Sequence, residues 1–282
     1  LSFFAIIYIG DFMTFASRER FKERKYSYMK KKELDEENPL LKLGKIIVFS
    51  PLLVFGTIGQ IIDKNNIKVK AIGGTSAGSI VATLYAMGYK PYYIYVLFKK
   101  YAQEIINISN ASLLNGLGNL IKSKKVGFSG LNDGIMLEKM FNEIALRKRI
   151  RLIDIKKPLV ISTVDIAEAK EYVITNCAPR DNLKDNYITE IEVGKAVRAS
   201  SSFPAFFCPC EFKNHIFMDG GVLDNTPVLP LKQICDKKII AVNFESDSVG
   251  EDCDVMDVIM KSLDIMGNEI SEKRFEQSDL IL

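Results

Sequence analysis

Apolar and polar positions follow two alternating patterns from about residue 45 to residue 245. Short, uninterrupted apolar runs bounded by turn residues indicate buried strands, whereas longer stretches with an apolar residue every three or four positions indicate amphipathic helices. The predicted strands cover residues 45–49, 67–72, 158–164, 171–175, 215–218 and 238–244. The predicted helices cover residues 59–65, 77–87, 91–106, 134–149, 191–199, 227–235 and 254–277, and residues 110–130 have the composition of a loop-rich insert.

This alternation predicts the fold class. Strands that are connected through helices form a parallel sheet with helices on both faces. We therefore expect an α/β protein with a central, mostly parallel sheet flanked by helices, formed by residues 45–245, and a C-terminal helical segment over residues 246–282. In such sheets the functional site lies at the carboxyl ends of the strands.

Residues 1–38 differ from the rest of the chain and are expected to form an N-terminal extension, apolar first and then basic. Residues 18–32 contain eight basic side chains. A membrane-surface arm is one interpretation, but a solvated, disordered extension is favoured because the apolar face is thin. The apolar run at residues 1–10 lacks a basic flank in front of it, which argues against a complete signal peptide. The start at Leu1 leaves a non-native N-terminus open.

Composition and charge exclude several functions. The chain has 38 Lys and Arg residues and 35 Asp and Glu residues, so its net charge is only +3. This small charge gives nucleic-acid binding no support. No window of about 18 residues is apolar and free of charge, so no membrane-spanning helix is expected. The five cysteines are odd in number in a long chain, which favours reduced thiols in a cytoplasmic protein over a disulfide framework.

The sharpest chemical signal follows the strand predicted at residues 67–72. Gly74-x-Ser76-x-Gly78 lies between this strand and a helix, which is the context of a nucleophile elbow. Glycine on both sides of the serine avoids clashes with the neighbouring strand and helix. The serine hydroxyl would then be exposed at the rim of the sheet, at the positive end of the helix. A structural or phosphate-binding turn is the alternative, but the Gly-Lys-Ser/Thr sequence of a P-loop is missing.

A nucleophilic serine needs a base, and His215 is the only histidine. It precedes Asp219 by four residues on a predicted strand, which separates the two by about 13 Å at the strand rise. His215 is therefore expected to be a half-buried strand residue and not part of a triad. Asp219 would lie exposed at the sheet rim, where Gly220 and Gly221 let the backbone approach closely. A plain Asp-Gly turn is the alternative, but the lack of a usable histidine favours Asp219 as the partner of Ser76.

A metal site receives little support from the sequence. Cys208, Cys210 and His215 offer three ligands in one short stretch. Structural zinc sites usually add a second ligand pair at a characteristic spacing, and none is present here. No metal is expected.

Three motifs together resemble the patatin-like phospholipase family, in order and in spacing. They are Gly-Gly-Thr-Ser-Ala-Gly-Ser over residues 73–79, Arg-Ala-Ser-Ser-Ser-Phe-Pro-Ala-Phe over 198–206, and Met-Asp-Gly-Gly-Val-Leu-Asp-Asn-Thr-Pro-Val over 218–228. The resemblance implies a Ser-Asp dyad that hydrolyses lipid acyl esters, with Ser76 as the nucleophile and Asp219 as the general base. It implies no metal or organic cofactor, a lipid or lysolipid substrate, and transient contact of a cytoplasmic protein with a membrane surface.

One segment departs from the family pattern. The family carries a Gly-Gly-Gly-x-x-Gly loop, whose amides form the oxyanion hole, where residues 50–59 read Ser-Pro-Leu-Leu-Val-Phe-Gly-Thr-Ile-Gly. Pro51 also lacks an amide hydrogen. The oxyanion donors are thus unassigned, and reduced activity is expected. One alternative is a catalytically impaired patatin-fold protein that binds lipid or a partner; another is a non-enzymatic membrane-associated protein that acts through its basic arm and the helix at residues 91–106.

Overall fold

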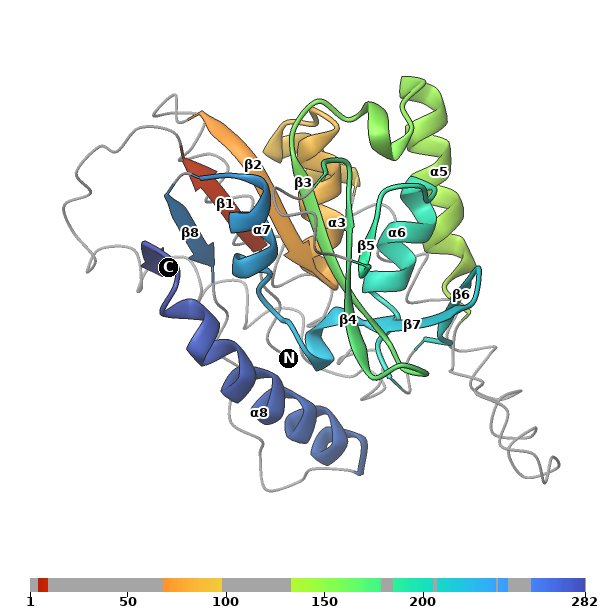
Figure 1. Cartoon of the computed structure of the whole chain (residues 1–282). Helices are drawn as coiled ribbons and strands as arrows, with labels where there is room; N and C mark the ends of the chain where they lie inside the picture. The colour runs from red at the N-terminus through yellow and green to blue at the C-terminus, as the bar shows by residue number, and fades with distance from the viewer. Residues whose placement is uncertain are drawn as a thin grey trace, which may run out of the picture.

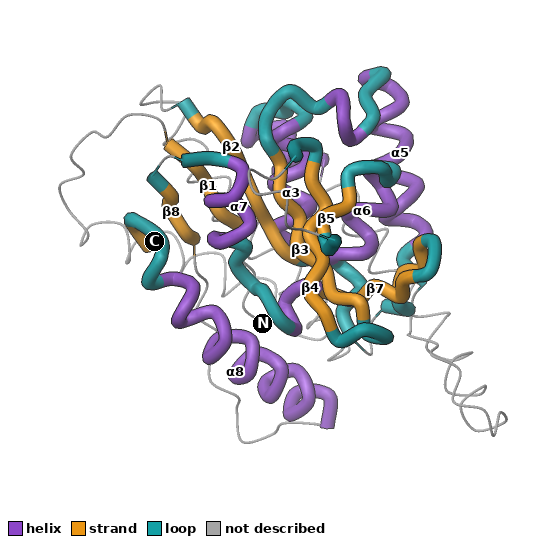
Figure 2. Tube along the Cα trace, in the orientation of Figure 1, coloured by secondary structure: helices purple, strands orange, loops and turns teal. Residues whose placement is uncertain are grey.

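The computed structural model describes residues 5–9, 68–97, 133–178, 185–204, 207–236, 238–242 and 255–281. The described strands belong to one sheet (Figures 1 and 2). They are β1 (Ala5–Ile9), β2 (Val69–Thr75), β3 (Leu159–Asp165), β4 (Lys170–Thr175), β5 (Tyr187–Ile188), β6 (Cys210–Phe212), β7 (His215–Asp219), β8 (Ile239–Val242) and β9 (Leu280–Ile281). The helices are α3 (Ala77–Ala86), a helical stretch at 91–97, α5 (Ile135–Lys148), α6 (Val193–Ser200), α7 (Val228–Ile234) and α8 (Val255–Phe275).

The expected α/β class and the flanking helices are confirmed, and the sheet is mixed. Its main path runs β5-β4-β3-β2-β1-β8-β9, with β7 beside β3 and β6 beside β7. The pairs β2–β3, β4–β5 and β8–β9 are parallel, and the other described pairs are antiparallel. Short connections explain the difference, because the turns between β3 and β4 and between β6 and β7 are too short for the crossover that a parallel pair requires.

Successive residues of the central strands point to opposite faces of the sheet, as the two-residue period of a strand requires. Ile72, Ile161 and Ile174 enter a large core that includes apolar side chains of α3, α5 and α6. Their neighbours Ala71, Val160 and Val173 enter a smaller core with Val228 and Leu231 of α7. Figure 1 shows the same division, with α7 on one side of the sheet and α3 and α6 on the other.

A close helix pair holds α6 in place. A Cβ atom on Gly194 would overlap the carbonyl oxygen of Glu138, so glycine lets α6 approach the backbone of α5. The Gly194 amide donates to Asn142 Oδ1 at 2.8 Å. Arg198 Nη1 donates to Glu138 Oε2 at 2.8 Å, and both side chains are largely buried. The Gly194 contacts hold the start of α6, and the Arg198–Glu138 pair holds the end that carries Ser200.

Several expectations can be compared with the described residues, and others cannot. The strands and helices predicted between residues 67 and 235 are present within three residues at their ends, except that only the first part of the helix predicted at 91–106 lies among the described residues, as a helical stretch at 91–97. Strand β2 extends past its predicted end through Gly73 and Gly74 to Thr75. The sequence did not predict β5, β6, β9 or β1, which lies between β2 and β8 inside the expected extension. The strand predicted at 45–49, the helix at 59–65 and the segment 50–59 lie outside the described residues. Within the part of the chain that is described, no helix has the length and apolar character to cross a membrane.

Candidate active site

Strands β2 and β7 meet end to end along one edge of β3. Parallel pairing places Thr75, the last residue of β2, opposite Ser162. Antiparallel pairing places Asp219, the last residue of β7, opposite Thr163. Because one strand is parallel to β3 and the other antiparallel, their carboxyl ends face each other. The residues that leave these two ends therefore come together above adjacent positions of β3.

Ser76 occupies the turn between β2 and α3 in a strained conformation. Its backbone angles are φ 54° and ψ −124°, a region that side-chain-bearing residues rarely adopt. A Cβ atom on Gly74 would overlap the carbonyl oxygen of Gly78, so glycine at position 74 is a steric requirement of this turn. Strand, strained serine and helix thus follow one another as the elbow pattern predicted.

Three serines at the end of α6 hold this turn and the end of β7, and sequence reasoning did not assign them a role. The Ser76 amide donates to Ser200 Oγ at 3.0 Å, and the Ser200 hydroxyl donates to the Ser162 carbonyl at 2.7 Å. The Ser201 hydroxyl donates to the Ser76 carbonyl at 3.2 Å. The Asp219 amide donates to the Ser202 carbonyl at 3.0 Å. The run of serines after a helix was the available signal, although only spatial proximity shows what it does.

Glycines let Asp219 reach the turn. A Cβ atom on Gly220 would overlap the Ser162 carbonyl and would lie 2.8 Å from Thr75 Cγ2, so only glycine allows this approach to β2 and β3. The Gly221 amide donates to Asp219 Oδ1 at 2.8 Å and orients the carboxyl group. The other oxygen, Oδ2, is buried and has no partner at hydrogen-bond distance and angle among the described residues.

Burial sets the protonation of Asp219. It raises the pKa of this carboxyl to about 7, while the hydrogen-bonding interactions of the Ser76 hydroxyl and the Gly221 amide oppose the rise. The Ser76 side chain therefore lies close enough to favour the carboxylate, although the two groups do not meet at the distance and angle of an ordinary hydrogen bond. Such loose contacts are common at catalytic pairs without substrate. A carboxyl with a pKa near neutrality can accept a proton at the pH where most enzymes work.

Both residues are less accessible than the sequence suggested. Only 6% of the surface of Ser76 and 2% of that of Asp219 are exposed. The expectation of side chains exposed at the sheet rim is wrong in this respect. The reason is local: the end of α6 and the loop after Asp219 both pack onto the turn.

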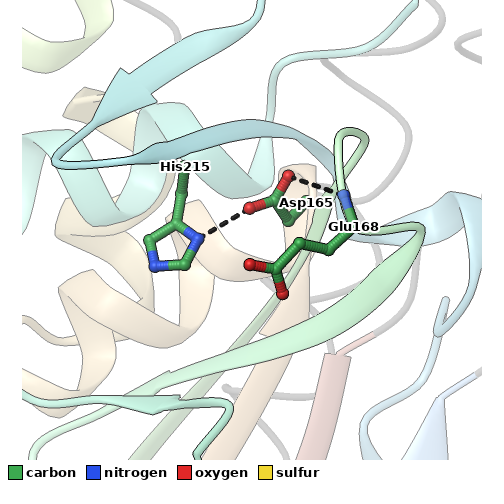
Figure 3. Close-up of side chains that lie close together, drawn as sticks. All are labelled: Asp165, Glu168 and His215. Atoms are coloured by element: carbon green, nitrogen blue, oxygen red, sulfur yellow. Dashed lines mark hydrogen bonds and ion pairs between the residues drawn. The ribbon is translucent and has the colours of Figure 1, made fainter.

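His215 lies at the opposite end of β7 and pairs with a different carboxylate. Its Nδ1 lies 2.6 Å from Asp165 Oδ2, and Glu168 lies beside the pair (Figure 3). His215 is half-buried, as predicted, and its ring stacks on Phe217 with centroids 5.2 Å apart. It takes no part in the Ser76–Asp219 contact.

Asp165, Glu168 and His215 also form a cluster of the kind that could hold a metal ion. Their ligand atoms lie within 4.8 Å of one another. Several of these ligand atoms already have partners within the protein. Asp165 Oδ1 accepts from the amides of Ala167 and Glu168, and Glu168 Oε2 accepts from the Tyr172 hydroxyl at 2.7 Å. The group is therefore satisfied as a structural network.

The cysteines near His215 do not join this network. Cys210 is buried, and burial raises the pKa of its thiol to about 11, which keeps it neutral. The described cysteines form no disulfide. These features fit the expectation of reduced, partly buried thiols.

Comparison with known proteins identifies the family. Residues 58–232 match the model of the patatin-like phospholipase family, which covers more than half of the chain and includes both Ser76 and Asp219. The chain belongs to this family. The match stops before β8 and α8, which continue the fold beyond it.

Individual relatives are distant. The chain is 26% identical over 165 residues to the "Probable lipid hydrolase 463L" of Invertebrate iridescent virus 6, covering 57% of this chain and 52% of the viral protein. It is 30% identical over 188 residues to "Lysophospholipase NTE1" of Candida albicans, covering 66% of this chain and 12% of that protein. It therefore spans about half of the viral relative and a small part of the yeast one. Among solved structures, VipD from Legionella pneumophila matches 76% of this chain and 47% of that chain at 14% identity and a TM-score of 0.32.

Proposed function

We propose that this protein is a serine acyl hydrolase that cleaves acyl esters of phospholipids or lysophospholipids, with Ser76 as the nucleophile and Asp219 as the general base. One observation carries the proposal. A serine in a strained turn at φ 54° lies beside a buried carboxyl group whose pKa is raised to about 7. Strain of this kind is retained in proteins mainly at functional sites. The family membership supports hydrolysis of lipid acyl esters as the reaction of this pair.

The first half of the reaction forms an acyl-enzyme. Asp219 accepts the proton of the Ser76 hydroxyl while Ser76 Oγ attacks the ester carbonyl carbon. The resulting tetrahedral intermediate collapses, the C–O bond to the leaving alcohol breaks, and that alcohol receives the proton from Asp219. The Gly221 amide holds Oδ1 throughout, which leaves Oδ2 to exchange the proton.

The second half releases the fatty acid. Asp219 takes a proton from a water molecule, the water attacks the acyl carbonyl, and Ser76 leaves with the proton that Asp219 returns. Negative charge develops on the carbonyl oxygen in both halves. Ala77 is the first residue of α3, so its amide has no acceptor within the helix and can donate to that oxygen, assisted by the positive end of the helix.

The oxyanion hole is expected to be weaker than in relatives with the glycine-rich loop. Residues 50–59 lack the Gly-Gly-Gly-x-x-Gly sequence of the family. Loss of one donor reduces the rate by roughly 100- to 1000-fold. Replacing residues 50–59 by a family-like glycine-rich loop should raise turnover by a similar factor, and a folded chimera without any gain would mean that other residues already supply the donors.

A lipid substrate brings the protein to a membrane or micelle surface. The names of the relatives refer to lipid hydrolysis and to lysophospholipids, and we extend that substrate class to this chain. We propose that a cytoplasmic protein contacts this surface transiently while it takes up substrate. The dyad requires no metal and no organic cofactor.

A fluorophosphonate probe tests the proposal directly, because it labels only activated serines. The wild-type protein should be labelled and should hydrolyse a short p-nitrophenyl ester. Ser76→Ala should abolish both without unfolding the protein, since the change removes one oxygen atom. Ser262→Ala is the matched control, because Ser262 is exposed on α8 and its hydroxyl donates only within that helix, to the Val258 carbonyl; it should leave both labelling and hydrolysis unchanged. Unlabelled, folded wild-type protein would favour a catalytically impaired member of the family that binds lipid.

A further inference from the structure

A buried ionic cluster lies behind the loop that carries Asp219, and the proposed reaction does not use it. Arg274, in the last turn of α8, places Nη1 2.6 Å from Asp224 Oδ2. The same nitrogen lies 3.2 Å from Glu171 Oε2 of β4. Asp224 is fully buried, and the other two side chains are about one-fifth exposed. One guanidinium from the C-terminal helix thus bridges two carboxyl groups, one on the sheet and one on the loop.

Asp224 connects this cluster to both halves of the candidate site. Its backbone carbonyl accepts a hydrogen bond from Thr75 Oγ1 at 2.9 Å, one residue before the proposed nucleophile. Its amide donates to the Gly220 carbonyl at 2.7 Å, one residue after the proposed base. Its Oδ1 accepts from the Thr226 amide at 3.1 Å. Any movement of Asp224 would therefore be passed to the residues on either side of the Ser76–Asp219 contact.

Helix α8 contacts the same loop at a second point. A Cβ atom on Gly267 would lie 3.1 Å from the Gly221 carbonyl oxygen and 2.9 Å from Asn225 Nδ2, so the helix passes close against the loop. Gly221 supplies the amide that holds Asp219 Oδ1. The helix thus touches the loop beside the oriented oxygen of the base as well as at Asp224.

We propose that α8 is a positioning element for Asp219, and that Arg274 holds the loop over residues 219–226 in its working conformation by bridging Asp224 to Glu171. This inference rests on the proposed function for its catalytic consequence. It assigns a role to a helix that lies beyond the end of the family match at residue 232. Asp219 performs the chemistry, and Arg274 acts on it only through the loop.

The charges explain why the guanidinium matters. Burial and the neighbouring Glu171 raise the pKa of Asp224 well above its usual value, and Arg274 opposes that rise. Without Arg274, two adjacent carboxyl groups would share a buried space with no positive charge. A buried carboxyl that loses its partner is unfavourable. Asp224 must then either keep a proton that it shares with Glu171 or move with its loop toward water.

The experiment compares Arg274→Met, which keeps an unbranched apolar stem and removes the charge, with Lys273→Met on the exposed neighbouring position. Hydrogen–deuterium exchange is measured on the amides of residues 219–226 and, as an internal reference, on β3. Arg274→Met should raise exchange of the loop at least about tenfold and leave β3 unchanged. It should lower kcat by about 10- to 100-fold with KM within about twofold, the scale of a misplacement of a catalytic group by about 1 Å. Lys273→Met should change neither.

Two further variants keep the test decisive. Arg274→Lys should recover only part of kcat, because an ammonium cannot bridge two carboxyl groups as a guanidinium fork does. Gly267→Ala perturbs the second contact without altering any charge and should also raise loop exchange. Loop exchange equal to that of the wild type in both Arg274→Met and Gly267→Ala would overturn the positioning role, as would an unchanged kcat in a folded Arg274→Met protein. A wild type without turnover would count against the proposed function alone, since the exchange data would still decide the role of the helix.

Discussion

The two ends of β7 carry two ionisable residues in opposite situations. At its start, His215 and Asp165 lie 2.6 Å apart, and the other oxygen of Asp165 accepts two backbone amides. At its end, Asp219 is buried like Asp165, but its Oδ2 has no partner at hydrogen-bond distance and angle among the described residues. It lies beside a serine with a positive φ. The first pair has completed its interactions, whereas the second has an acceptor left for a proton.

The two ends of β7 thus differ in whether the buried carboxyl group still has an acceptor for a proton. Leaving a buried acceptor unpaired costs stability, so it persists only where the surrounding backbone fixes it. Here Gly220, Gly74 and the serines at the end of α6 provide that fixation. Positive φ also occurs near His215, at Ala169 and Lys213, but there His215 and Asp165 meet each other directly. The experiments below test whether reactivity follows this contrast.

The largest effect is expected for Asp219→Asn. An amide has nearly the shape of the carboxyl group but cannot accept the serine proton, so kcat should fall by about 100- to 10,000-fold. Steady-state kinetics on a p-nitrophenyl ester and the rate of fluorophosphonate labelling measure the loss. Asp165→Asn, which changes the partner of His215 at the start of β7, is the control. It should retain most of the kcat of the folded wild type. Equal losses in the two variants would remove the distinction between the ends of β7.

The pH dependence should follow Asp219. Because its pKa is raised to about 7, the base is protonated below that value, and kcat/KM should fall about tenfold for each pH unit below 7 and level off above it. The pH dependence of the stability of the fold should have the opposite sign to that of kcat/KM. The raised pKa means that folding penalises the charged form, so wild-type stability decreases as pH rises from about 4 to 7. The thermal midpoint of Asp219→Asn should therefore exceed that of the wild type at pH 8 and approach it near pH 4. A kcat/KM profile that is flat between pH 5 and pH 8 would show that Asp219 is not the titrating base.

Gly220→Ala tests the steric part of the arrangement. The added methyl group would overlap the Ser162 carbonyl, and overpacking of this kind costs about 1–3 kcal/mol of the free energy of unfolding. We also expect kcat to fall, because the loop can make room only by moving Asp219. Gly73→Ala is the matched control, since a Cβ atom there would meet its neighbours at 3.4 Å and fits. Chemical denaturation and ester turnover of both variants decide the matter.

The smallest effect is expected for His215→Gln. Loss of the ring should leave kcat within about threefold of the wild type, which is less than 1 kcal/mol in the activation free energy. Stability should fall modestly, because Asp165 Oδ2 loses its close partner. A loss of kcat as large as that of Asp219→Asn, in a folded variant, would restore a triad with histidine and contradict the proposed dyad.

Much of this architecture could be predicted from the local sequence. The remaining features depend on how strands and other segments pair in space. Strand β3 was predicted from an uninterrupted apolar run and α5 from its helical period, and the elbow was recognised because glycine spacing, strand and helix coincide in Gly74–Gly78. The two-residue strand β5 is too short to have a period, and the pairing of β1 is decided by its neighbours in space. The burial of Ser76 and the roles of Ser200 and Arg274 could not be predicted either, because each depends on segments that are distant in sequence.

The meeting of β2 and β7 on one edge of β3 also has a consequence for folding. Thr75 and Asp224, which join the two halves, are 149 residues apart in sequence. Contacts between such distant segments form late, because the entropy lost on closing a long loop must be offset by many other contacts. During synthesis the chain carries the proposed nucleophile, Ser76, long before it carries the proposed base, Asp219. Helical structure should return before esterase activity when the denatured protein is refolded, and an unfinished chain should be unable to attack the membrane lipids around it.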